Sequence, residues 1–230
     1  MNPFFEFPPA ARRRFYGKLA GLMLLSYLPF VGLIWAIGVQ GVPFLLMFMA
    51  ISFTIVAPFF DVPNLVQAGT LRYHSKFLLS ELKKSGDLAL HAGSLFDYYF
   101  TFRAHPDIPN RTAFILKDQL EGLLALLEAY QNHPERRIFW TTHFVSDRNA
   151  QRLGFQRVPI DGVQSIILIF NYFNLMLAAS IAKQKWVAPN LSETKSFETT
   201  VGELQEKSDR IRSALATLSR STLVHTEDRT

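Results

Sequence analysis

The sequence has no cysteine among its 230 residues. This absence excludes disulfide bonds, thiol nucleophiles and zinc sites built on cysteine ligands. The histidines show no H-E-x-x-H or H-x-H spacing, so no metal site is predicted. P-loop and dinucleotide-binding fingerprints are missing too, and no cofactor is predicted from motifs. A chain without cysteine is compatible with a domain in the reducing cytoplasm.

Charge is missing from one long stretch, because no Asp, Glu, Lys or Arg occurs from Leu19 to Phe60. The whole chain is 49% apolar with a mean hydropathy of +0.11, which is high for a soluble protein. Each half of the stretch approaches the roughly 20 apolar residues that cross a bilayer core. Gly41 and Pro43 interrupt it where a tight turn is expected. We therefore predict a two-helix transmembrane hairpin over residues 19–60.

The basic residues in front of this stretch orient the hairpin. They are Arg12, Arg13, Arg14 and Lys18. Against Glu6 they give residues 1–18 a net charge of +3, and such residues stay in the cytoplasm. The prediction is a multi-pass protein of a bacterial inner membrane, with a basic cytoplasmic N-terminus (1–18) and both chain termini in the cytoplasm. A cleaved signal peptide is the alternative, but the apolar stretch is too long and a second span follows at once.

The overall positive charge does not indicate a nucleic-acid partner. The net charge is +5 and the isoelectric point is near 9.5. Most of this charge precedes the first span, whereas a nucleic-acid binder concentrates Lys and Arg on its folded domain. The predicted partners are instead the lipid bilayer and its anionic head groups.

Residues 61–190 are predicted to form a cytoplasmic α/β (α+β) domain with a mostly antiparallel sheet packed with helices. Apolar and polar residues alternate in its strands, and one long segment has the period of an amphipathic helix. In the second predicted hairpin strand, Phe96, Tyr98, Phe100 and Phe102 share one face. The expected elements are a strand within 70–79, two strands around the turn at 92–94, a helix over 112–131, a strand within 136–145, a short helix before Gly154 and a strand over 155–158.

A third uncharged segment covers residues 162–182. Two interpretations are open: another membrane span, or a helix buried between the sheet and the membrane or another subunit. We favour the buried helix, because the segment carries Gln164, Ser165, Asn171 and Asn174.

The C-terminal region has a heptad pattern. Apolar positions are spaced alternately by four and three residues from Phe197 to Leu218. This predicts a helix over 191–220 that docks on its own domain or forms a coiled coil in a homodimer. The last residues, 221–230, are predicted to be disordered.

One predicted hairpin turn holds the candidate catalytic residues His91, Ser94 and Asp97. Their side-chain types match those of a nucleophilic triad. However, no G-x-S-x-G elbow is present, and a turn contains Gly and Ser for local reasons. Tyr99, on the polar face of the same predicted strand as Asp97, is a further candidate to line a pocket.

A second polar strand face is predicted close to the membrane. Arg72, His74 and Lys76 follow the second span by about ten residues. Anionic lipids attract such residues by about 1 kcal/mol each near the surface. Together with Arg12, Arg13, Arg14 and Lys18 they form the predicted membrane-surface set.

The segment from Asn149 to Phe155, N-A-Q-R-L-G-F, resembles the closing motif of the GNAT acetyltransferases, where a helix with Asn and Ala runs into a Gly-Phe strand. The preceding order of three strands, a long helix and a strand is also similar to that fold. The resemblance covers residues 70–158 and implies acyl-CoA as cofactor, with Asn149 and Arg152 as candidate binding residues. Two features depart from the family: "RAHPDIPNR" has no glycine and two prolines where the family has a Gly-rich phosphate loop, and the family's general-acid Tyr is absent.

From these observations we expect a non-catalytic accessory or scaffold component of a membrane assembly, which can include another membrane-protein subunit. The alternative is a membrane-bound GNAT-like acyltransferase that acts on a lipid or a peptide.

Overall fold

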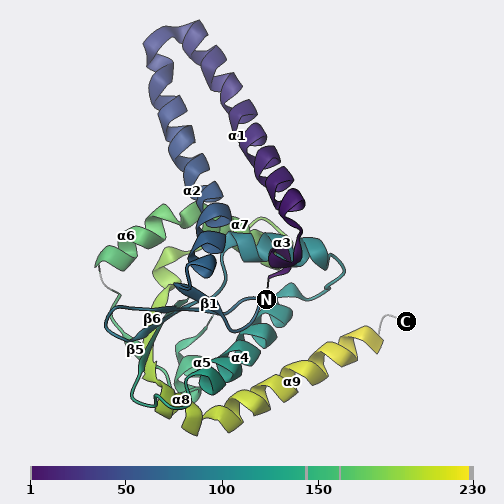
Figure 1. Ribbon diagram of the computed structural model, residues 1–230, viewed down its shortest axis with the longest axis vertical. Coiled ribbons are helices and arrows are strands. Elements are labelled where there is room, and N and C mark those ends of the chain that lie inside the picture. The colour runs from purple at the N-terminus through teal and green to yellow at the C-terminus, as the bar shows by residue number, and fades with distance from the viewer. Residues whose placement is uncertain (1, 143–144, 161, 228–230) are drawn as a thin grey trace.

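The computed structural model describes residues 2–142, 145–160 and 162–227. The chain forms an α+β domain with a mixed sheet, preceded by a long apolar helical segment, Pro9–Gln67. This segment is long and apolar enough to cross a membrane. It consists of α1 (Pro9–Ile37), a 3-10 turn (Gly38–Gly41) and α2 (Val42–Gln67), and α2 runs back beside α1 (Figure 1).

The turn at Gly41 needs a glycine. A Cβ atom there would lie 3.0 Å from the backbone of Ile34, which is closer than side-chain carbons normally approach. Aromatic rings hold the two helices together below the turn, because Phe30 stacks on Phe48 with 4.4 Å between ring centroids.

The sheet has six strands in the order β1-β2-β3-β4-β6-β5. Neighbouring strands are antiparallel except β3 and β4, which are parallel. The strands are β1 (Leu71–Tyr73), β2 (Leu79–Leu82), β3 (Leu88–His91), β4 (Arg137–Thr142), β5 (Gln156–Val158) and β6 (Lys195–Thr200). Because β6 lies between β4 and β5, the fold extends past the predicted domain boundary at residue 190.

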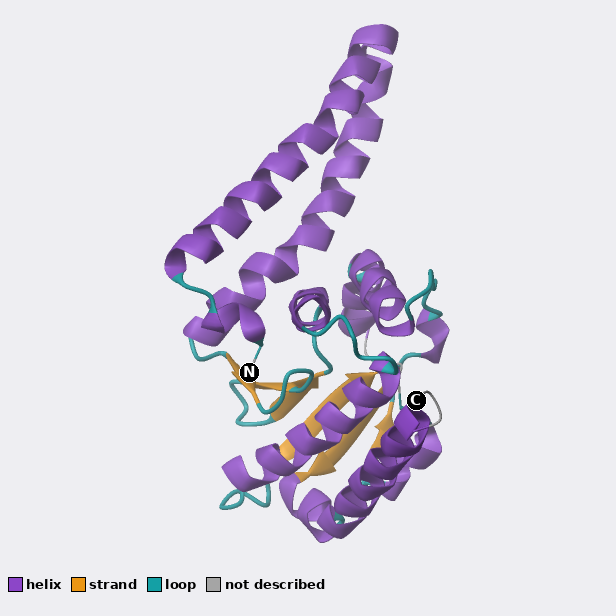
Figure 2. Cartoon of the chain, turned by 90° about the vertical axis from the view of Figure 1, so that its right-hand side faces the viewer, coloured by secondary structure: helices purple, strands orange, loops and turns teal. Residues whose placement is uncertain are grey.

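Helices cover one face of the sheet and one end of its strands (Figure 2). The helices of the domain are α3 (Leu95–Ala104), α4 (Arg111–Ala129), α5 (Asp147–Arg152), α6 (Gly162–Phe170), α7 (Tyr172–Lys183), α8 (Val201–Glu206) and α9 (Ser208–Glu227). Helices α4, α5, α8 and α9 lie against the covered face, while α3, α6 and α7 lie at the end of the sheet nearer α1 and α2. The predicted helix over 112–131 is present as α4.

The domain has two hydrophobic cores. The aliphatic core, under α4 and α9, is built mainly of Leu and Ile, including Leu78, Leu88, Leu120, Leu123, Leu126, Ile138 and Ile211. The aromatic core, between the sheet and the long helices, is built mainly of Phe and Tyr: Phe4, Phe59, Phe77, Phe96, Tyr98, Phe100 and Phe102. The N-terminal 3-10 helix, η1 (Pro3–Glu6), inserts Phe4 into the aromatic core.

The predicted second hairpin strand with its alternating aromatic residues is wrong, because this segment is helix α3. Ser94 and Asp97 form a capping box, in which each side chain accepts a hydrogen bond from the other residue's backbone N–H. The alternation is misleading because η1, α2 and α7 surround this helix. All four aromatic side chains are therefore buried, whichever side of the helix they are on.

The predicted continuous heptad helix is also corrected. Phe197, where the heptad pattern begins, lies in β6, and the helical part is divided at Lys207 into α8 and α9. Thr200 and Glu203 form a capping box that starts α8 immediately after the strand. Helix α9 continues to Glu227, into the stretch 221–230 that is predicted to be disordered. Residues 228–230 lie outside the described residues.

The third uncharged segment forms two short helices, α6 and α7, which meet at Asn171 with a bend of 64°. Helix α7 buries Asn174, Ala178, Ala179 and Ala182. Helix α6 has no buried residue, so the expectation of a buried helix holds for α7 and is wrong for α6.

Candidate functional site

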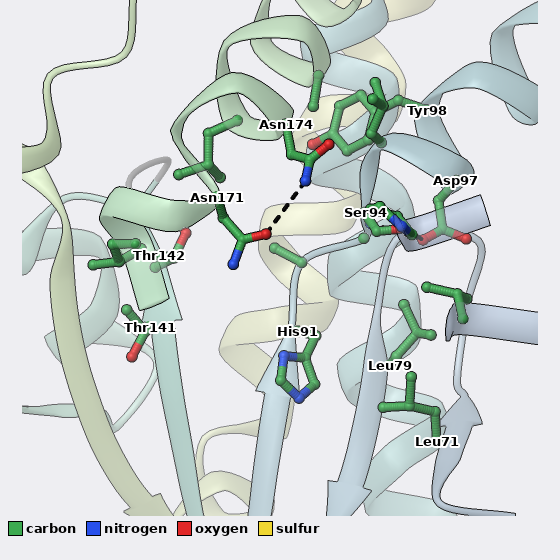
Figure 3. Close-up of a pocket in the computed structure, with 18 of the residues that line it drawn as sticks. Leu71, Leu79, His91, Ser94, Asp97, Tyr98, Thr141, Thr142, Asn171 and Asn174 are labelled. Atoms are coloured by element: carbon green, nitrogen blue, oxygen red, sulfur yellow. Dashed lines mark hydrogen bonds between the residues drawn. The ribbon is translucent and has the colours of Figure 1, made fainter. Parts of the chain in front are cut away.

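A cavity of about 340 Å³ opens at the carboxyl ends of β3 and β4. The two parallel strands pair only from Leu88 to Leu90. Beyond this point β3 turns into α3, while β4 continues along β6 to Thr142. The strands therefore part, and a ligand site is commonly found where parallel strands separate in this way. Figure 3 shows the side chains around the opening.

The cavity has an apolar wall and a polar edge. The apolar wall comes from the end of α2 and from α6 and α7, with Pro58, Val62, Leu65, Leu168, Leu175 and Ala178. The polar edge comes from the strands and the α6–α7 corner, with Glu81, His91, Thr141, Thr142 and Asn171. Such a division suits a molecule or segment with one apolar and one polar part.

His91, on the polar edge, is a titratable side chain with a charged neighbour and a shifted pKa. Its Nε2 lies 3.3 Å from Oε2 of Glu81, and the His91 side chain is 49% exposed. Burial against the cavity wall lowers the His91 pKa, Glu81 opposes this shift, and Lys83 adds to it. Because a carboxylate only accepts, Nε2 carries the proton in the contact with Glu81, and in the neutral ring Nδ1 is then an acceptor.

Ser94 and Asp97 also line the cavity, but their polar atoms already have partners inside the protein. Asp97 is fully buried and accepts hydrogen bonds from the Ser94 backbone N–H (2.7 Å) and hydroxyl (2.9 Å), from Tyr73 (2.5 Å) and from the Asn2 amide (2.9 Å). Burial raises the pKa of Asp97, and these four donated bonds act in the opposite direction. Asp97 thus connects the N-terminus, β1 and α3.

The candidate triad is not assembled as a relay in the described part of the chain. Ser94 and Asp97 bond to each other, whereas the ring of His91 bonds to Glu81. Tyr99 is elsewhere: it accepts a hydrogen bond from Arg103 and packs on Phe15 and Phe59.

Asn149 and Arg152 line a different cavity, of about 560 Å³, between α4, α5 and α9. Trp140 of β4 is part of that lining, on the covered face of the sheet. The two helix N-termini between β3 and β4 are capped by the chain itself, α3 by Ser94 with Asp97 and α4 by Asn110, which accepts from the Ala113 N–H. At the N-terminus of α3, a phosphate group would therefore compete with the carboxylate of Asp97.

The membrane-surface set divides into two groups. Arg12 donates to the carbonyls of Phe5 and Phe7. Three further basic residues are exposed at the domain end of α1: Arg13, Arg14 and Lys18. The predicted second face does not form, because β1 ends at Tyr73. Arg72 is exposed, Lys76 lies over the Phe114 ring, and His74 bonds to Ser80 (2.8 Å). Burial, with a contribution from Arg72, lowers the His74 pKa to about 4.

The sequence analysis does not predict that Asn171 and Asn174, at the α6–α7 corner, line the site, because the strands that they face are distant in sequence. It could have found the roles of Ser94 and Asp97, since S-x-x-D before an apolar run is a helix-start signal. In the described ranges, no group of three or more His, Asp or Glu side chains could hold a metal ion. No protein-family model, curated protein or solved structure matches this chain.

Proposed function

We propose that the chain is an integral inner-membrane protein, held by α1 and α2 with both termini in the cytoplasm, and that its α+β domain is a non-catalytic accessory or scaffold component of a membrane assembly. In this role the cavity receives an amphipathic group, a lipid or an apolar segment of another subunit. One observation supports the proposal: hydrogen bonds and aromatic packing connect the domain end of α2 to both α1 and α7. This contact region, called the joint below, forms part of the wall of the cavity.

The surface of α1 and α2 supports membrane anchorage. Large apolar side chains such as Leu22, Leu25, Trp35 and Met47 are exposed along both helices. A soluble protein rarely leaves so large an apolar surface uncovered. With 29 residues, α1 is about 44 Å long, which exceeds the roughly 30 Å of a bilayer core. The basic residues Arg13, Arg14 and Lys18 at the domain end favour a cytoplasmic domain.

The joint depends on two prolines in α2, Pro58 and Pro63. Proline has no N–H, so the carbonyl four residues earlier in an α-helix loses its partner. The carbonyl of Thr54, freed by Pro58, accepts a hydrogen bond from Asn174 of α7 (2.6 Å).

The second freed carbonyl is that of Phe59, four residues before Pro63. It accepts from the hydroxyl of Tyr16 in α1 (3.1 Å). Backbone groups near a bilayer core need such internal partners. The two bonds tie α1 and α7 to the same end of α2.

The chemistry of the cavity favours binding over catalysis. The hydroxyl of Ser94 and the carboxylate of Asp97 are used in the helix cap, which leaves no activated nucleophile in that pair. His91 and Glu81 can instead hold the polar part of a ligand at the edge, while the apolar part contacts α2 and α7.

Crosslinking in cells tests this proposal. A photoreactive amino acid replaces Leu175 in the cavity wall, and the control replaces Lys117 on α4, whose side chain is 41% exposed. We expect a discrete lipid or protein adduct from position 175, identified by mass spectrometry of the isolated protein. Adducts from position 175 that do not exceed those from position 117 would contradict the proposed role of the cavity.

The parting of β3 and β4 beside the long helix α4 favours a second candidate, the GNAT-like acyltransferase acting on a lipid or peptide. In that case acyl-CoA would enter the same opening. Because Asp97 occupies the N-terminus of α3, we expect no acyl-CoA binding at physiological concentration. Calorimetry on the detergent-solubilised protein decides between the two, and micromolar binding would replace the scaffold proposal with the enzyme.

A further inference from the structure

Helix α6 exposes an apolar surface that no part of the described chain covers. Its residues carry no charge, and five of them are between 52% and 68% exposed: Val163, Ile166, Ile167, Ile169 and Phe170. Contiguous exposed apolar residues of this kind mark a surface that contacts another molecule or a membrane.

The polar residue Gln164 of α6 faces the protein. Gln164 donates from Nε2 to the Thr141 hydroxyl, and its Oε1 accepts from Ser196 (3.3 Å). Thr141 and Ser196 also bond to each other across β4 and β6 (2.7 Å). A surface helix of a soluble domain normally turns its polar side outward. Helix α6 has the reverse orientation, which is suitable for contact with hydrocarbon.

The position of α6 along the anchor follows from the joint. Asn174, which bonds to the Thr54 carbonyl, also donates to Asn171 at the α6–α7 corner (3.3 Å). Thr54 precedes Asp61, the first charged residue after the apolar stretch, by seven residues. At the rise of an α-helix this corresponds to about 10 Å. The corner therefore lies level with the apolar part of α2, and Figure 1 shows α6 extending sideways from there.

Helix α6 is too short to cross a bilayer. Its nine residues extend about 14 Å, half of the hydrocarbon thickness. The bend of 64° at Asn171 also prevents α6 and α7 from forming one straight span. A short helix with an outward apolar face at this level lies in the interface.

We propose that α6 is an interfacial helix embedded in the cytoplasmic leaflet, with Ile166, Ile169 and Phe170 among the acyl chains. It is a second membrane contact, separate from the α1–α2 anchor, and it holds the open end of the cavity at the lipid surface. This inference rests on the proposed anchorage by α1 and α2. The bilayer is the occupant that the level of α6 along α2 favours over a second copy or another protein.

Spin labels at single cysteines test the inference directly, since the chain has no cysteine to remove. Full-length protein in phospholipid nanodiscs carries a label at Ile169→Cys in α6, at Met47→Cys in α2 or at Lys117→Cys on α4. Collision rates with oxygen, which partitions into lipid, and with a water-soluble nickel complex are measured for each. We expect the Ile169 label to resemble the Met47 label, with an oxygen-to-nickel ratio severalfold above that of Lys117.

If Met47 faces lipid and Ile169 faces water, the interfacial helix is disproved and the anchor stands. If both face water, the proposed anchorage itself fails. A label at Ile169 shielded from both reagents means that protein covers α6, which also overturns the inference. Thermal unfolding of the three variants verifies that each is folded.

Discussion

The aliphatic and aromatic cores differ in what they join. The aliphatic core connects segments of the domain to each other, mostly α4, α8 and α9 with the sheet. The aromatic core connects the domain to the N-terminal segment, because Phe4 of η1 and Phe59 of α2 pack against Phe96 and Phe100 of α3. Polar contacts at Asp97, Asn174 and Tyr16 also cross this core. They fix the orientation of the helices relative to each other, which aromatic packing alone does not determine. Helices α1 and α2 are thus packed into the fold of the domain.

The largest expected effect is at Asp97. Asp97→Ala leaves donors from Asn2, Tyr73 and Ser94 without an acceptor in a buried place. We expect the free energy of unfolding to fall by about 3 kcal/mol or more. Hydrogen exchange in η1 and the domain end of α1 should increase, while exchange in α4 stays low.

Ser94→Ala is the matched control for Asp97→Ala, because it removes one of the four bonds and keeps the carboxylate. Denaturant unfolding in detergent should show a clearly smaller loss for Ser94→Ala. Equal losses in the two variants would mean that Asp97 does not connect the three elements as described.

The next effect concerns the carbonyl that Pro58 leaves free. Asn174→Leu removes the donor to Thr54 and should cost about 1–3 kcal/mol. In a Pro58→Ala background the helix supplies its own N–H, so the same substitution should cost much less. The difference between the two backgrounds is the interaction energy of a double-mutant cycle. The same cost in both backgrounds would disprove this account of the joint.

The stability of the aliphatic core should depend on pH through His74. Its ring lies beside Tyr130, which packs against that core. The folded state keeps His74 neutral down to a pKa of about 4, whereas the unfolded ring takes up a proton near pH 6.5. The stability that depends on the neutral ring is therefore complete above pH 6.5 and decreases as the pH falls toward 4.

We expect this loss to be about 1–2 kcal/mol, after allowance for the partial exposure of the ring. Thermal unfolding between pH 7 and pH 4 measures it. His74→Gln keeps a hydrogen-bonding group next to Ser80 and should make the profile flatter. If the stability of His74→Gln falls with pH as steeply as that of the unmodified protein, His74 is not the cause of the pH dependence.

The two cores also differ in how far the sequence predicts them. Helix α4 of the aliphatic core follows its periodic pattern, because the spacing of Leu120, Leu123 and Leu127 by itself indicates a helix. Helix α3 has the sequence pattern of a strand because its environment comes from distant segments. Because η1, α2 and α7 enclose most of this helix, the alternation of its aromatic residues carries no information on strand geometry.

The candidate site illustrates the same limit. The residue types and spacing draw attention to His91, Ser94 and Asp97, and all three do line the cavity. They could not predict that Asp97 would be bonded to Asn2, because a pairing across 95 positions leaves no periodic signal. The wall from α6 and α7 was equally hidden, since it depends on the bend at Asn171.

The proposed anchorage, with both chain termini in the cytoplasm, can be measured by labelling intact cells with a membrane-impermeant maleimide. Val39→Cys lies in the turn between α1 and α2, and Lys117→Cys lies on the domain. We expect Val39→Cys to react in intact cells and Lys117→Cys to react only after the cells are broken. Labelling of Lys117→Cys from outside, with Val39→Cys protected, would contradict the proposed anchorage.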